Sequence, residues 1–447
     1  MSPAVREARQ GASRRWSSAD WAPLGVTSLV FCTLVVLGAG GLRGTDQYWY
    51  VADAARLAAG ESAHTNEVFP VSVVGGLDIP RPFVHNGPAQ YVVAAVAGWT
   101  GAYAAWIILG VLFSVLTALL IAREVAAHTS RRVGSWAGAV FLAFPLTMWQ
   151  ASQPLLEVWL TLLVVSIGVL LAAPGRRPRS WFLATLAAGV LFWSRFTFIP
   201  VLFALPIAFA VVNRRDLRRQ WLPLFILIAV VAGFVMAEPI LFPSHQPFTF
   251  GEYVNGTTTW KATDMLFVRP DGAVTFSTIA RKALDALVQQ FWPDVTASAL
   301  FYWPFTVAVA LLALILLRRS ELRRTPWAAV TVFLLLLHLA TIVLYRNQFR
   351  YMLPVTPALV ICLGAWSAGW WRTPLRKTVF ATVTIVGICA GTLLMLHSRV
   401  GGSEARELRD RLENAYAANL SDDRPVLVQY PRAGGFVHAY VLRPRLV

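Results

Sequence analysis

Apolar segments of about 20 residues recur along this chain and constrain its fold more than any other feature. Short arginine clusters or polar loops separate them. A helix rises 1.5 Å per residue, so about 20 apolar residues cross the ~30 Å hydrocarbon core of a bilayer. Only 14% of the 447 residues are charged, against about 25% in an average soluble domain. The sequence therefore predicts an all-α polytopic membrane protein.

The apolar segments predict about eleven transmembrane helices. Residues 89–99 are apolar but too short to cross a bilayer, so we expect them to form a helix near the membrane surface. Residues 281–292 have apolar side chains at helical spacing, which predicts a second interfacial helix. The predicted spans are 21–42, 103–122, 133–150, 154–173, 180–194, 197–212, 221–243, 300–317, 325–345, 352–371 and 378–396.

The arginine clusters predict the orientation of these spans. They alternate with loops that carry the acidic residues, as expected if the basic loops stay in the cytoplasm. Residues 1–20 are then a basic cytoplasmic N-terminus, and residues 21–396 form the transmembrane domain, with outer loops at 43–102 and 244–299. Residues 397–447 form a small extracytoplasmic tail with a charged helical segment. Arginine greatly outnumbers lysine, and alanine and valine are abundant, which is typical of a GC-rich bacterial genome. We therefore expect a bacterial protein, located in the plasma membrane.

The net charge of +16 does not indicate a nucleic-acid partner. The basic residues lie in the short turns between apolar segments, where membrane topology accounts for them. The cysteines, Cys32, Cys362 and Cys389, all lie within apolar segments and have no spacing typical of a disulfide framework or a metal site.

The stretch GTDQYWYVADAARLAAGE follows the first predicted span directly. Asp46, Tyr50, Ala54, Leu57 and Gly60 are separated by steps of four, four, three and three residues, which place them on one face of a helix. A final glycine suits the end of such a helix. The macrodipole alone would also favour an acid near a helix N-terminus. The spacing by itself therefore leaves open a structural role for Asp46.

Three motifs in chain order resemble membrane glycosyltransferases of the GT-C superfamily. The helix that begins near Asp46 resembles the start of their first outer loop. HNGPAQYVVAAVAGWTG, from His85, resembles the segment after that loop, and FRYMLPVTPALVI, from Phe349, resembles the entry into a late span. The similarity is greatest to the branch of protein O-mannosyltransferases and lipid A aminoarabinose transferases. This chain has Gln47 where many relatives have glutamate after the first aspartate.

The resemblance implies an inverting transfer of a sugar from a polyprenyl-phosphate donor to an acceptor hydroxyl on the outer face. A hydroxyl must lose its proton as it attacks, and Asp46 would be the base. Cations must stabilise the leaving phosphate, and Arg81, Arg195 and Arg350 are the candidates. The same arginines also have ordinary interpretations: Arg350 as a snorkelling residue and Arg81 as a loop residue.

Five further residues are candidate substrate contacts. Glu157 matches the position of a second acid in the family, and it would orient the acceptor or pair with Arg195. The others are Tyr50, Asp53, His85 and Tyr351. The first loop lacks an Asp-x-Asp motif, so we expect no obligatory cofactor, although a divalent metal stays possible.

The expected partners are a polyprenyl-phosphate-linked sugar, membrane lipids, and a glycan, lipid or protein acceptor. Three other functions fit the same composition. A transporter or flippase of a lipid-linked sugar would show internal repeats and charges at the middle of the membrane, and neither is evident. A polysaccharide polymerase or ligase would use a sugar oligomer on a diphosphate carrier, and a scaffold for envelope assembly would have no catalytic residues.

Overall fold

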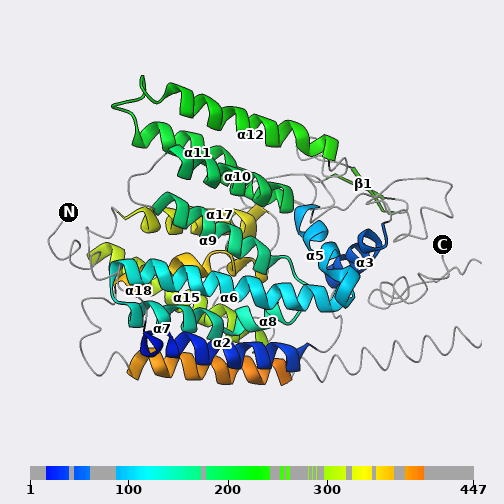
Figure 1. The fold of residues 1–447 in the computed structure, drawn as a ribbon, viewed down its shortest axis with the longest axis vertical. Helices are drawn as coiled ribbons and strands as arrows, with labels where there is room; N and C mark the ends of the chain where they lie inside the picture. The colour runs from blue at the N-terminus through cyan, green and yellow to red at the C-terminus, as the bar shows by residue number, and fades with distance from the viewer. Residues whose placement is uncertain are drawn as a thin grey trace, which may run out of the picture.

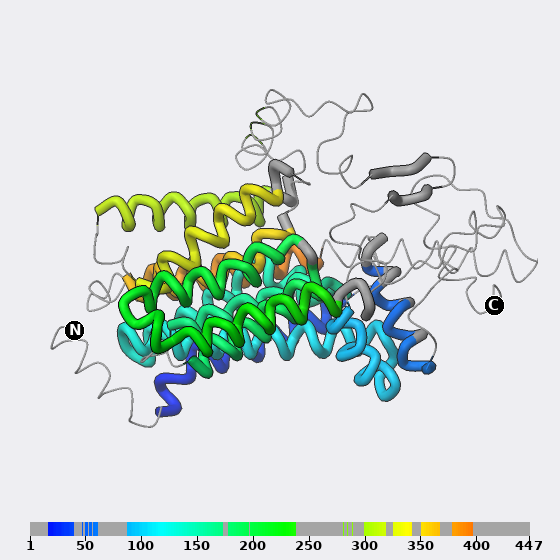
Figure 2. The backbone as a smooth tube through the Cα atoms, turned by 90° about the horizontal axis from the view of Figure 1, so that it is seen from above, coloured from blue at the N-terminus to red at the C-terminus, as the bar shows by residue number. Residues whose placement is uncertain are grey.

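In the computed structural model, most of the helices form a bundle in which they run between the same two ends of the molecule (Figures 1 and 2). Its helices are α2 (Ser18–Gly38), α3 (Thr45–Ala58), α5 (Gly87–Thr100), α6 (Ala102–His128), α7 (Arg131–Ala143), α8 (Pro145–Ala151), α9 (Glu157–Ala172), α10 (Pro178–Ser194), α11 (Ile199–Val212), α12 (Trp221–Leu241), α15 (Thr296–Arg318), α17 (Pro326–Leu344), α18 (Thr356–Trp366) and Thr378–Leu396, with the 3₁₀ turns η1 (Phe196–Phe198) and η2 (Phe349–Met352). The structure describes residues 17–39, 45–60, 87–172, 178–241, 252–255, 258–261, 296–318, 325–344, 349–366 and 378–396, and the single positions 280, 284 and 288.

The helices match most of the predicted spans. Among the described residues, four helices are long and apolar enough to cross a bilayer: Ser18–Gly38, Ala102–His128, Ala299–Arg318 and Thr378–Leu396. Five shorter apolar helices lie at other predicted spans. The multi-pass helical architecture is therefore confirmed. The number of eleven spans and the orientation stay predictions.

The segment 133–150 differs from the single continuous span that the sequence predicts. The structure divides it into α7 and α8 at Phe144, whose φ of −66° and ψ of 124° are extended. Proline has no backbone N–H and disfavours helical geometry in the residue before it. Pro145 therefore ends α7 and begins α8.

Small residues allow α6 and α7 to pack at short range. A Cβ added to Gly138 would lie 2.7 Å from the backbone oxygen of Ala118, and one added to Gly134 would collide with the backbone oxygen of Ala122. The two glycines are four residues apart and so share one face of α7. This small-xxx-small arrangement is typical of helix packing in membranes, where close contact replaces the hydrophobic effect.

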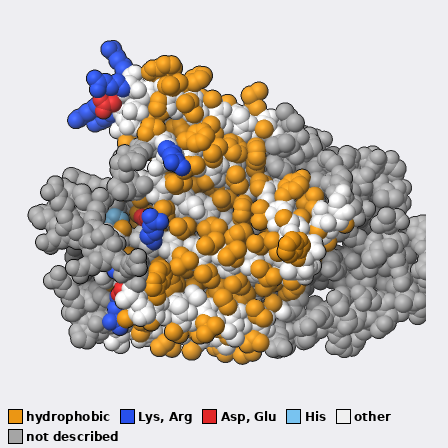
Figure 3. Space-filling view, viewed as in Figure 1, with side chains coloured by type: hydrophobic (Ala, Val, Ile, Leu, Met, Phe, Trp, Pro, Cys, Tyr) orange, Lys and Arg blue, Asp and Glu red, His pale blue; other side chains and the backbone are white. Residues whose placement is uncertain are grey.

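The outside of the bundle is apolar. Leu29 is 71% exposed and Leu393 is 66% exposed. On the face drawn in Figure 3, hydrophobic side chains cover most of the described middle, and the blue Lys and Arg side chains lie towards one edge. An apolar belt of this kind requires lipid around it.

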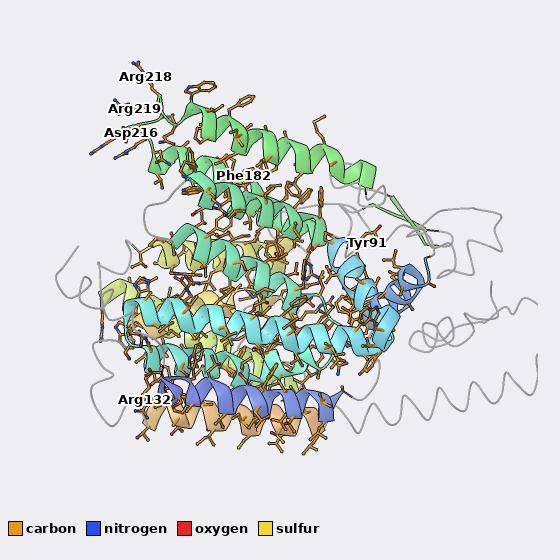
Figure 4. All side chains as sticks on the ribbon, viewed as in Figure 1. Tyr91, Arg132, Phe182, Asp216, Arg218 and Arg219 are labelled. Carbon is orange, nitrogen blue, oxygen red and sulfur yellow. The ribbon has the colours of Figure 1, made fainter. Side chains whose placement is uncertain are left out.

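The two ends of the bundle differ in character. Arg132, Arg218 and Arg219 lie at one end in Figure 4, whereas α3 and α5 lie at the other (Figures 1 and 4). Both helices were predicted, and α5 covers the short apolar segment 89–99. The positive-inside rule would place the end with the arginines in the cytoplasm and the end with α3 and α5 on the extracytoplasmic side.

A two-stranded antiparallel sheet, which was not predicted from the sequence, occupies part of the second long loop. Strands β1 (Glu252–Asn255) and β2 (Thr258–Lys261) pair with Tyr253 opposite Trp260. Threonines and aromatic residues favour strands. The predicted helices in 281–292 and in the tail after residue 397 lie almost wholly outside the described residues.

Candidate functional site

A buried carboxylate lies at the end of the bundle that carries α3 and α5. Glu157 is the first residue of α9 and is 0% exposed. A helix N-terminus stabilises a negative charge. The position follows from the sequence, because the apolar run of α9 begins directly after this residue.

Arg195 neutralises this carboxylate. Its Nη1 donates to Oε1 of Glu157 at 2.9 Å, so the predicted alternative in which Glu157 pairs with Arg195 is present. Arg195 follows the last residue of α10, and its carbonyl accepts from Phe198 as the chain turns into η1. The indole of Trp159 donates to Ser194 at 2.9 Å and holds α9 and α10 together beside the ion pair.

A second guanidinium reaches the same carboxylate from a distant part of the chain. Nε of Arg350, in η2, lies 3.4 Å from Oε1 of Glu157. The ring of Tyr351 lies beneath both cations, 4.3 Å from Cζ of Arg195 and 5.3 Å from Cζ of Arg350. Cation–π contacts of this kind hold a guanidinium in place.

The surroundings keep Arg195 charged. Burial lowers the pKa of its guanidinium, but Tyr351 and Glu157 raise it by more, and the net shift of the pKa is upward. Tyr50 of α3 also interacts electrostatically with this guanidinium. Helix α3 therefore lies beside the arginine cluster, which we define as Glu157, Arg195, Arg350 and Tyr351.

Helix α3 is anchored next to this cluster. The indole of Trp106 in α6 donates to the carbonyl of Tyr50 at 3.1 Å, and the two rings lie 5.6 Å apart. Asp53 is 6% exposed on the same helix. Asp46 lies in the first turn of α3, as the sequence predicts.

The structure thus brings together candidate residues from four parts of the chain. Arg81 and His85 fall outside the described residues, and their roles stay predictions. No group of three or more His, Cys, Asp or Glu residues that could hold a metal occurs in the described part of the chain. Two fixed guanidinium groups beside a polar helix can bind an anion, and phosphate is the anion that guanidinium geometry suits best.

The arrangement of helices is similar to that of ArnT, a membrane protein of known structure that has the GT-C fold. The chain is similar to two structures of ArnT from Cupriavidus metallidurans. Against ArnT bound to undecaprenyl phosphate the TM-score is 0.62 at 14% identity, covering 95% of this chain and 85% of that one. Against apo ArnT the TM-score is 0.58 at 15% identity, covering 94% and 83%.

These similarities confirm the fold that the sequence motifs implied. ArnT is a lipid A aminoarabinose transferase. It therefore belongs to the branch that the sequence motifs resemble. No protein-family model matches the chain, and no curated protein matches it in sequence.

Proposed function

We propose that this protein is an inverting glycosyltransferase. It moves a sugar from a polyprenyl-phosphate donor to an acceptor hydroxyl on the extracytoplasmic face of a bacterial plasma membrane. The observation that carries the proposal is the arginine cluster beside α3. It supplies fixed cations at one end of the fold, next to the helix that carries Asp46 in its first turn.

Arg195 and Arg350 bind the phosphate of the donor. Glu157 and Tyr351 hold both guanidinium groups in position before the substrate arrives. Charge develops on the phosphate as the bond to the sugar breaks, and preorganised cations stabilise such a charge without further rearrangement. The second oxygen of Glu157, Oε2, makes no hydrogen bond within the described residues. It is available to accept one from a substrate hydroxyl.

Asp46 is the catalytic base. The oxygen of the acceptor hydroxyl forms a bond to the anomeric carbon while the bond from that carbon to the phosphate oxygen breaks. Asp46 takes the hydroxyl proton, and the polyprenyl phosphate leaves with the bonding electrons. A base is required because the pKa of a sugar or protein hydroxyl is far above neutrality.

Transfer by purified Asp46→Asn protein tests this role. The substitution keeps the size of the side chain and removes the base, so we expect the transfer rate to fall by about 10²- to 10⁴-fold with donor binding nearly unchanged. The matched control is Asp216→Asn, because Asp216 is exposed at the opposite end of the bundle (Figure 4). Transfer by Asp46→Asn at the parent rate would reject the assignment and make Asp53 or Glu157 the better candidate.

The same preparation separates the competing functions. Proteoliposomes receive a labelled polyprenyl-phosphate sugar and an acceptor extract. A transferase changes the chemical identity of the label, a flippase moves it between leaflets unchanged, and a polymerase or ligase requires an oligomer on a diphosphate carrier. The sugars that accumulate on lipid in a strain lacking the protein would then identify the natural donor.

A further inference from the structure

Three buried glutamines at the end of the bundle that carries α3 and α5 have no role in the mechanism above. Gln90 is 1% exposed, Gln150 is 0% exposed and Gln153 is 2% exposed. Within the described residues, the amide nitrogen and the amide oxygen of each make no hydrogen bond. Buried carboxamides without partners are unusual, because each unmade bond carries the full cost of desolvation.

All three glutamines lie in elements at the end of the bundle that carries the arginine cluster. Gln153 lies in the turn between α8 and α9, four residues before Glu157, and Gln150 lies in the last turn of α8. Gln90 lies in the first turn of α5, and α5 packs against both α3 and α10. Figure 1 shows α5 across the end of the bundle at which α10 ends and α9 begins.

Other buried polar side chains show what a purely structural role looks like here. Ser114, Thr117 and Thr185 are 0% exposed, and each hydroxyl donates to the carbonyl one helical turn earlier. These three hydroxyl groups are therefore satisfied within their own helices, unlike the glutamine amides. The glutamine amides have donors and acceptors that remain available for a ligand carrying both.

We propose that Gln90, Gln150 and Gln153 bind the hydroxyl groups of the transferred sugar and select a neutral, polyhydroxylated sugar. The inference rests on the proposed function and specifies its donor. A carboxamide has two donor hydrogens and one acceptor oxygen, and each sugar hydroxyl both donates and accepts. The two guanidinium groups share the single carboxylate of Glu157, so one positive charge stays unbalanced. That charge would repel a cationic amino sugar but not an uncharged sugar.

Ligand binding to the full-length protein in nanodiscs tests this assignment. The probes are undecaprenyl phosphate alone, the same lipid carrying mannose or arabinose, and the lipid carrying an amino sugar. In Gln150→Met and Gln153→Met, which keep side-chain length and remove the amide, we expect the neutral glycosylated lipids to bind about 3- to 10-fold more weakly. Undecaprenyl phosphate should bind within about twofold of the parent, because the arginine cluster is unchanged.

Thermal stability provides the second measurement. Replacing an unsatisfied buried amide by an apolar side chain of similar shape removes a desolvation cost, so Tm should stay the same or rise. The control is Thr185→Val, whose lost hydroxyl is already bonded to the carbonyl of Trp181. It should leave the preference between bare and glycosylated lipid unchanged. Gln153→Asn retains the amide, so this variant should keep part of the preference for neutral glycosylated lipid over undecaprenyl phosphate.

The outcomes separate this inference from the proposed function. If the parent protein does not bind undecaprenyl phosphate, the proposed function fails. The parent protein could instead bind undecaprenyl phosphate while the glutamine variants keep its full preference for neutral glycosylated lipid over bare lipid. In that case the glutamines are structural, and this inference alone is wrong. Tighter binding of the amino sugar than of mannose and arabinose would also overturn it.

Discussion

The interaction between Glu157 and Arg195 is the contact on which the proposed phosphate site depends most directly. Their atoms lie 2.9 Å apart, and the side chains of Glu157 and Arg195 are 0% and 20% exposed. At an effective dielectric constant of about 20, the gross attraction at this distance is about 5–6 kcal/mol. Desolvation offsets much of it, so we expect a net coupling of about 1.5–3 kcal/mol, the range for hydrogen bonds to charged groups.

A double-mutant cycle measures this coupling. Glu157→Gln leaves two guanidinium groups without their shared carboxylate, and we expect the free energy of unfolding to fall by about 3–5 kcal/mol. Arg195→Gln leaves Glu157 with Arg350, 3.4 Å away, and should be less destabilising. In the double variant the loss should be smaller than the sum of the two by the coupling energy.

Reversible titration with SDS in mixed micelles gives these free energies of unfolding. Arg218→Gln is the matched control, because Arg218 is exposed at the opposite end of the bundle. It should change stability by less than about 0.5 kcal/mol. A measured coupling below about 0.5 kcal/mol would refute the reasoning and leave Glu157 and Arg195 as neighbours that contribute independently.

Three further predictions follow from the same structure. Arg350→Gln should weaken binding of undecaprenyl phosphate by about 1.5–3 kcal/mol, measured by titration in nanodiscs, and unchanged affinity would leave Arg350 as a structural anchor. Gly138→Leu should lower the free energy of unfolding by about 1–3 kcal/mol, because the added Cβ would lie 2.7 Å from the backbone oxygen of Ala118. The control is Gly25→Leu, since a Cβ added to Gly25 meets nothing within 4 Å. A cysteine at Ser403 should react with a membrane-impermeant reagent while the inner membrane is intact, and labelling only after that membrane is broken would reverse the topology.

Much of the helical framework could be predicted from hydropathy. The apolar run that begins after Glu157 and the run that ends before Arg195 coincide with α9 and α10. Hydropathy reports how each segment partitions between water and lipid, and that preference is local to the segment. The helix of α3 was predictable for a similar reason, since its periodicity is a property of consecutive residues.

The effect of individual prolines could not be predicted in this way. Pro145 separates α7 from α8, whereas Pro206 lies inside the continuous helix α11 and Pro304 inside α15. In a membrane, neighbouring helices and local adjustments can satisfy the backbone group that a proline leaves free. Whether a helix continues through proline therefore depends on its surroundings.

The sequence alone determined that this chain is a multi-pass helical membrane protein, because a long apolar segment has few alternatives in a bilayer. It also indicated the GT-C fold and suggested Glu157 and Arg195 as partners. Only the tertiary structure decided that Arg350 reaches the same carboxylate over the ring of Tyr351, and that three glutamines are buried without partners in the described part of the chain. The contacts of Arg350 and Tyr351 join segments that are distant in the sequence. Close side-chain fit between helices brings such segments together, and hydropathy does not encode that fit.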